Sequence, residues 1–127
     1  MEELLRNAAE RAILYLQGLG ERRVAPDPSA LARLREFDRA LPSRGVDPEA
    51  VLALLDEVGS PGTIASASGR FFGFVVGGAL PATLAANWLA GAWDQNAGMV
   101  ALSPVGAVLE EVSLKWLVDL LGLPEGT

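Results

Sequence analysis

The sequence has no cysteine and no histidine, and these two absences exclude several kinds of site. Without cysteine there can be no disulfide framework and no thiolate nucleophile, and without either residue there can be no ordinary zinc finger. Without histidine the chain has no Ser-His-Asp triad and no imidazole acid or base. The sequence therefore offers none of the commonest catalytic constellations.

Lysine and positive charge are also scarce. Lys115 is the single lysine, so a Schiff-base mechanism would have to use it or a lysine outside this chain. The 127 residues carry 16 acidic and 10 basic side chains, a net charge of −6, which offers no positive footprint for a nucleic-acid backbone. The start Met1-Glu2-Glu3 lacks the positive, apolar pattern of a secretory signal, so we expect a cytoplasmic protein without a nucleic-acid partner.

Apolar residues make up 50% of the chain, which is typical of a folded domain and not of a disordered one. Between Phe71 and Leu109 the only charged side chain is Asp94. Such a stretch needs cover from another surface, another subunit or a bilayer. Its first 23 residues are long enough for a membrane span, but they are rich in glycine and alanine and include Pro81 and Asn87. We therefore expect no membrane partner.

The first 60 residues are predicted to form a three-helix region. Apolar spacing predicts an amphipathic helix over 2–19. The pairs Asp27-Pro28 and Asp47-Pro48 are typical helix starts, an N-cap followed by proline, and predict helices that end at Leu41 and Gly59.

Residues 61–79 are predicted to form a loop followed by one short extended Gly/aromatic segment. Its core is an aromatic and β-branched run, 70–78, bounded by glycines. No phosphate-binding glycine motif is present. If this segment contacts a ligand, it would do so as an apolar wall, through Phe71, Phe72, Phe74, Val75 and Val76.

Residues 80–127 are predicted to form two longer apolar helices. The first begins at Pro81 and ends near Asp94, with Asn96 or Gly98 as a left-handed cap. The second runs over 104–121, from an N-cap at Ser103 to a stop at Gly122. Its last turns are apolar nearly all round, which predicts burial on more than one side. The chain should therefore be mainly α-helical.

Two isolated charges flank the apolar region, and each has two interpretations. Asp94 could be a catalytic acid or simply a solvated helix end, and Arg70 could bind a carboxylate or lie on the surface. The simpler interpretations are that Asp94 is a solvated helix end and that Arg70 lies on the surface. Lys115 follows Glu111 by four residues, the spacing of a helical ion pair. No catalytic, cofactor-binding or metal-binding residue is assigned in this chain.

Several spaced motifs together resemble the N-terminal part of the pyridoxal-phosphate-dependent amino-acid decarboxylases, in the aromatic-amino-acid branch of the group II enzymes. The resemblance begins at about Asp47 and extends to the C-terminus. The motifs are Arg70-Phe71-Phe72-Gly73-Phe74-Val75-Val76-Gly77-Gly78-Ala79-Leu80-Pro81-Ala82, Trp93-Asp94-Gln95-Asn96, Leu102-Ser103-Pro104, Leu109-Glu110 and the segment 116–124. Several motifs in the same order are more specific than any one of them.

The resemblance implies the N-terminal part of a fold type I enzyme, which assembles as an intertwined homodimer. In that family pyridoxal phosphate and its Schiff-base lysine belong to a large domain that lies beyond this segment, so no cofactor is expected to bind this chain. The resemblance places substrate-pocket residues at Phe74, Val75, Val76 and Gly77, and at Asn96, Ala97 and Gly98. The amino acid that the enzyme would use is not implied.

The implied function is a dimer-forming and pocket-lining segment of a carboxy-lyase, inactive alone. The alternative is a self-contained helical module that assembles with itself or with other proteins through its apolar faces and has no catalytic role. Both interpretations predict a homodimer or a higher oligomer.

Overall fold

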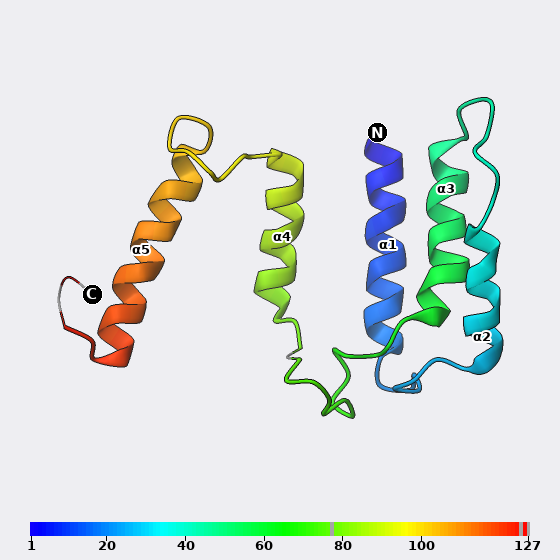
Figure 1. Ribbon diagram of the computed structural model, residues 1–127, viewed down its shortest axis with the longest axis horizontal. Coiled ribbons are helices and arrows are strands. Elements are labelled where there is room, and N and C mark those ends of the chain that lie inside the picture. The colour runs from blue at the N-terminus through cyan, green and yellow to red at the C-terminus, as the bar shows by residue number, and fades with distance from the viewer. Residues whose placement is uncertain (77, 125, 127) are drawn as a thin grey trace. The chain divides into compact units, whose positions relative to one another are not determined.

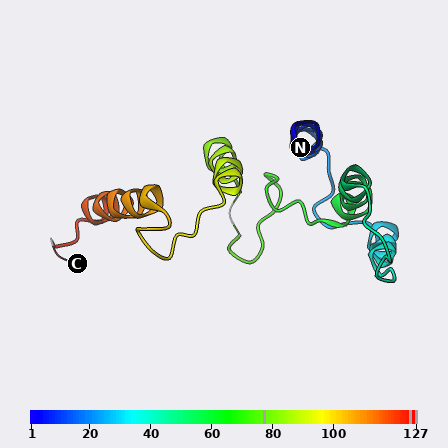
Figure 2. The same cartoon turned by 90° about the horizontal axis from the view of Figure 1, so that it is seen from above.

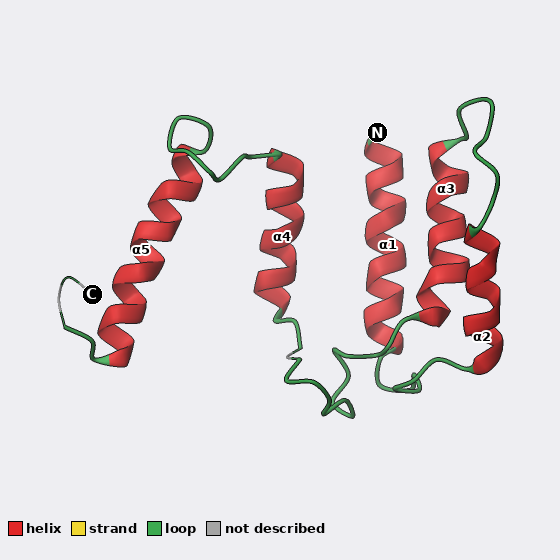
Figure 3. Ribbon diagram, in the orientation of Figure 1, coloured by secondary structure: helices red, strands yellow, loops and turns green. Residues whose placement is uncertain are grey.

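A computed structural model describes residues 1–76, 78–124 and 126, and over these residues it contains five α-helices and no β-strand (Figures 1 and 3). The chain divides into two compact units, Met1–Gly78 and Ala79–Thr127. The prediction of a mainly α-helical chain is confirmed. No strand forms in the part of the predicted extended segment that the structure describes.

Helix α1, Glu2–Gly18, is the amphipathic helix that the N-terminal apolar spacing predicts. Glu2 and Glu3 lie in its first turn, where negative charge is favourable to the helix dipole. Arg6 donates a hydrogen bond to the Glu2 carboxylate at 2.7 Å, one turn along the same face. After the helix the chain turns at Leu19, which is only 9% exposed and joins the small core.

Helix α2, Pro28–Arg33, begins at the expected position but is shorter than predicted. A 3-10 turn, Leu34–Phe37, follows it, and the helical path ends there and not at Leu41. The ring of Phe37 lies against Gly59, 3.5 Å from the position that a Cβ atom would occupy. This tertiary contact outweighs the weak local preference for further helix.

Helix α3, Pro48–Leu54, continues through a π-helical turn, Leu55–Gly59, into a 3-10 turn, Ser60–Gly62. The backbone N–H of Glu49 donates to the Asp47 carboxylate at 3.4 Å, as expected for an N-cap. Val58, in the π turn, is 2% exposed and is the largest fully buried side chain among the residues described. The helical path here runs slightly past the predicted end at Gly59.

Helix α3 and its continuation lie between α1 and α2 (Figures 1 and 2). Arg11 of α1 donates to the Asp56 carboxylate at 2.8 Å, and both side chains are partly buried. On the other side, the side chain of Leu34 covers Gly62. A Cβ atom at position 62 would lie only 2.7 Å from the Leu34 side chain. The first unit is therefore held by contacts between segments far apart in the sequence.

The loop that follows is tied to α1 and to the connection between α1 and α2. The hydroxyl groups of Tyr15 and Thr63 share a hydrogen bond of 2.9 Å. The backbone N–H of Ala65 donates to the carbonyl of Val24 at 3.0 Å, and Ala65 is fully buried. These bonds fix the start of the apolar segment in the first unit.

In the second unit, helices α4, Pro81–Trp93, and α5, Pro104–Leu121, confirm the two predicted long helices. The left-handed residue after α4 is Asp94, with φ 48°, so the prediction of this cap at Asn96 or Gly98 is wrong. Aspartate tolerates this conformation better than most residues because its short side chain can form local hydrogen bonds.

Both ends of α5 are capped as the sequence predicts. The Ser103 hydroxyl accepts a hydrogen bond from the N–H of Gly106 at 3.2 Å, and Ser103 is only 2% exposed. At the other end Gly122 adopts a left-handed conformation with φ 63°, where a Cβ atom would be strained. Local sequence signals are therefore sufficient to define this helix.

The second unit has no apolar core among its described residues. Helices α4 and α5 do not pack along one another, and Ser103 is the only buried side chain described in this unit. Trp116 is 72% exposed and Leu120 is 80% exposed. Among the described residues of this unit, the predicted burial of α5 on more than one side is not found.

Candidate functional site

The strongest candidate site is a tight apolar turn in the segment after the loop. Phe74 and Val75 both have φ 57°, and the N–H of Val76 donates to the carbonyl of Gly73 at 3.2 Å. Two successive left-handed residues closed by this bond make a type I′ turn. The prediction that the segment is extended is therefore wrong at Phe74 and Val75.

The side chains of this turn face solvent. Phe72 is 92% exposed, Phe74 is 91% exposed and Val75 is fully exposed. Phe71, by contrast, folds back over the backbone, and its ring would lie 3.1 Å from a Cβ atom at position 73. We call residues 72–76 the apolar turn. Adjacent exposed aromatic and β-branched side chains in a disfavoured backbone conformation indicate a site shaped for contact with another surface.

The predicted pocket residues divide between the two units. Phe74, Val75 and Val76 lie in the apolar turn of the first unit, and Gly77 lies outside the residues that the structure describes. Asn96, Ala97 and Gly98 lie in the second unit, in the turn between α4 and α5. Each group is therefore described within its own unit.

The second group forms a compact polar turn. The side-chain carbonyl of Asn96 accepts a hydrogen bond from the N–H of Gly98 at 3.0 Å, so Asn96 mimics a backbone turn. Gln95 donates its side-chain amide to the carbonyl of Trp93 at 2.9 Å. The turn therefore has a defined local shape, and Ala97 is exposed on it.

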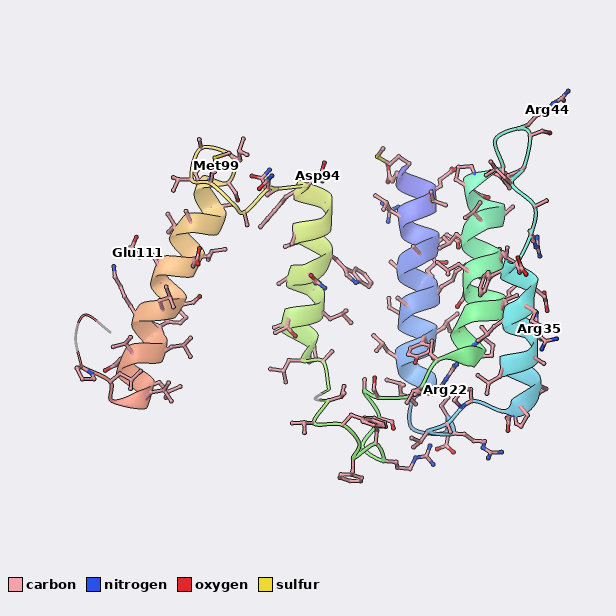
Figure 4. All side chains as sticks on the ribbon, in the orientation of Figure 1. Arg22, Arg35, Arg44, Asp94, Met99 and Glu111 are labelled. Atoms are coloured by element: carbon pink, nitrogen blue, oxygen red, sulfur yellow. The ribbon has the colours of Figure 1, made fainter. Side chains whose placement is uncertain are left out.

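The two isolated charges take their simpler roles. Asp94 lies exposed at the end of α4 (Figure 4) and serves as its left-handed cap. Arg70 donates to the backbone carbonyl of Arg22 and so helps to fix the loop.

Lys115, the single lysine of the sequence, does not fit a Schiff base with pyridoxal phosphate. The cofactor needs a lysine that can form a Schiff base, usually in a desolvated site. Lys115 is 69% exposed and donates to the Glu111 carboxylate at 2.6 Å on the polar side of α5. Lys115 is therefore an exposed residue of α5 that pairs with Glu111.

The pair on α5 makes a measurable prediction. The hydrogen bond from Lys115 and then its positive charge lower the pKa of the Glu111 carboxyl. We expect an NMR titration of Glu111 to show a midpoint below the ordinary glutamate value of about 4.3, and Lys115→Gln to restore that value. The pKa of Glu111 is lower in the folded chain than in the unfolded one. The pair therefore stabilises α5 when the pH is above the ordinary glutamate pKa, and this stabilisation is lost as the pH falls through the folded pKa. An ordinary or raised midpoint in the unsubstituted chain would contradict this ion pair.

Two further kinds of site are absent from the described residues. No described helix is both long enough and apolar enough to cross a bilayer. The same residues hold no group of three or more carboxylates that could bind a metal ion.

One group of residues has no signal in the sequence. Arg22, Arg23 and Arg33 come from the α1–α2 connection and from α2, and the fold brings all three to one cavity in the first unit. Their spacing follows no known motif. Only the adjacency of two arginines at 22 and 23 could have drawn attention to this place.

Comparison with known proteins adds no family. Neither the family models, nor the curated proteins, nor the solved structures contain a match to this chain. Its function must therefore be argued from the residues and surfaces described above.

Proposed function

We propose that this chain is the N-terminal dimerisation and substrate-pocket segment of a cytoplasmic pyridoxal-phosphate-dependent amino-acid decarboxylase, a homodimer of fold type I. The proposal starts from the series of motifs that runs from Arg70 to Pro124. Pyridoxal phosphate would supply the electron-accepting chemistry of decarboxylation from a domain outside this chain. The chain's own part would be to close and cover the site.

The observation that carries the proposal is the exposed apolar turn. Phe74 and Val75 present almost their whole side chains to solvent, in a conformation that costs free energy. An isolated protein gains nothing from such a turn, whereas a segment that completes another subunit's pocket does. There the turn would provide an apolar wall, exclude water and orient an amino-acid side chain.

The apolar helices support the same proposal. Trp88 of α4 is 45% exposed, and Trp116 and Leu120 of α5 are more exposed still. Large aromatic side chains of this kind are common at the centres of protein interfaces. Helices α4 and α5 would therefore be the surfaces that another subunit, or the rest of the same enzyme, covers.

The decisive experiment is to read the coding sequence past Thr127 and to express the whole frame. We expect the frame to continue into a glycine-rich segment and a lysine-bearing domain. The complete protein, supplied with pyridoxal phosphate, should release carbon dioxide from an amino acid, and the 127-residue chain under the same conditions should release none.

Two results would overturn the proposal. An immediate stop codon would favour the self-contained helical module, which needs no further domain. A complete protein that binds the cofactor but releases carbon dioxide from none of the standard amino acids would exclude decarboxylation while leaving the fold assignment intact.

A further inference from the structure

The first unit contains a cavity of about 360 Å³ where α1 has ended and α2 begins. The connection between these helices and the first turns of α2 form one side, and Pro61 and Thr63 form the other. Its polar lining includes the side chains of Arg22, Arg23, Asp27, Ser29, Arg33 and Thr63. All of these residues belong to one compact unit, so the cavity is a feature of that unit alone.

The charge of this lining is opposite to that of the chain. Three arginines and one aspartate line the cavity, and the Glu36 carboxylate pairs with Arg33 beside it, so positive groups still outnumber negative ones in a protein whose net charge is −6. The Ser29 hydroxyl adds a neutral hydrogen-bond donor. A local excess of positive charge inside a concave surface attracts and concentrates small anions.

Two of the guanidinium groups are held in place by other parts of the unit. Arg22 donates to the backbone carbonyl of Ser60, and its guanidinium carbon lies 4.6 Å from the centroid of the Tyr15 ring. Arg33 donates to the Glu36 carboxylate at 2.8 Å and to the carbonyl of Glu57 at 3.4 Å. Side chains fixed in this way lose less conformational freedom when a ligand binds.

These bonds use only part of the hydrogen-bonding capacity of the cavity. A guanidinium carries five N–H groups. Arg23 uses one of them to bind the Asp27 carboxylate at 2.7 Å, and Arg33 uses two in the bonds just given. The planar arrangement of the others suits the oxygens of a phosphate group, which arginine binds in a bidentate manner.

We propose that this cavity is a binding site for a small anion that carries a phosphate group. Its volume lies in the range of sites for small organic ligands, so the phosphate could bear a further organic part. Arg23 and Arg33 would bind the phosphate oxygens, and Arg22 would add positive charge from its fixed position. The proposal does not rest on the decarboxylase assignment and involves no residue of the apolar turn.

Inorganic pyrophosphate is the probe for this site, titrated into the 127-residue chain at constant ionic strength. We expect a saturable heat of binding, and shifts of the Nε–H signals of Arg22, Arg23 and Arg33 in the NMR spectrum. Arg23→Gln and Arg33→Gln should each weaken the binding at least fivefold. Arg23→Lys should fall between them and the unsubstituted chain, because it keeps the charge but loses the planar fork.

Arg44→Gln is the matched control. Arg44 is an exposed arginine of the same unit, at the end away from Arg22 (Figure 4). The substitution removes one positive charge, as Arg23→Gln and Arg33→Gln do, but outside the cavity, so binding should be unchanged. Equal weakening by Arg44→Gln would show that only net charge matters and would overturn the proposal. So would the absence of saturation, or shifts confined to arginines outside the cavity. Circular dichroism of each variant separates loss of binding from loss of folding.

Discussion

Trp116→Glu combined with Leu120→Glu is expected to raise the dissociation constant for self-association of this chain about a thousandfold. This factor is the one expected when two residues at the centre of an interface are lost. The two side chains lie one helical turn apart on α5 and are 72% and 80% exposed. Truncation of such a residue at an interface costs about 2 kcal/mol, so two together cost about 4 kcal/mol. Sedimentation equilibrium over a range of chain concentrations would measure the change.

Lys115→Glu provides the matched control for this experiment. It changes the net charge by the same two units as the double variant, but it lies on the polar side of the same helix, where Lys115 pairs with Glu111. We expect the oligomer to persist in this variant. Two results would contradict the proposed assembly: an unsubstituted chain that stays monomeric at every concentration, or a control that dissociates as readily as the double variant.

The beginnings of the helices are the part of the fold that the sequence predicts best. Asp27, Asp47 and Ser103 each precede a proline, and each stands at the start of a helix in the structure. These signals are local, because an N-cap side chain and a proline act on backbone groups within one turn. The same reasoning applies to Gly122, whose left-handed conformation ends α5.

The ends of the second and third helical segments could not be predicted in the same way. The helix from Pro28 gives way to a 3-10 turn, and the ring of Phe37 in that turn lies against Gly59, which follows it by 22 positions. The π turn that buries Val58 likewise depends on neighbouring segments. Tertiary contacts of this kind leave no local pattern in the sequence.

The candidate site was predictable in its composition but not in its shape. The aromatic and β-branched residues at 71–76 favour a strand, because such side chains usually pack on neighbouring strands. The residues described here provide no strand to pair with. The chain turns instead at Phe74 and Val75, two residue types that disfavour the left-handed conformation, so propensity argues against the observed turn.

The arginine-lined cavity shows a different limit of sequence reasoning. Arg23 and Arg33 are ten positions apart, and the Ser60 carbonyl that fixes Arg22 is much further along the chain. If the net charge of −6 is taken to be spread evenly over the surface, it argues against any anion site. Only the placement of individual charges in the fold reveals a local excess of the opposite sign.

Phe74→Asn combined with Val75→Gly is expected to stabilise the first unit by about 2 kcal/mol, because each left-handed position held by another residue costs about 1 to 2 kcal/mol. Asn-Gly is the preferred pair at the centre of a type I′ turn. Denaturant unfolding followed by the NMR signals of Val58 and Ala65, which are buried in this unit, would measure the gain. Phe72→Asn removes an equally exposed ring outside the left-handed positions and should give no gain.

The same double variant should have the opposite effect on function. In the complete enzyme of the proposed function, it removes the phenyl ring and the valine side chain that would line the pocket, so we expect a large loss of kcat/KM for the amino acid. The strain at Phe74 and Val75 would then be retained for activity at the expense of stability, a common balance at functional sites. Unchanged stability would show that the left-handed turn is not the populated conformation. A stabilised variant with full activity would confirm the turn and remove it from the substrate pocket.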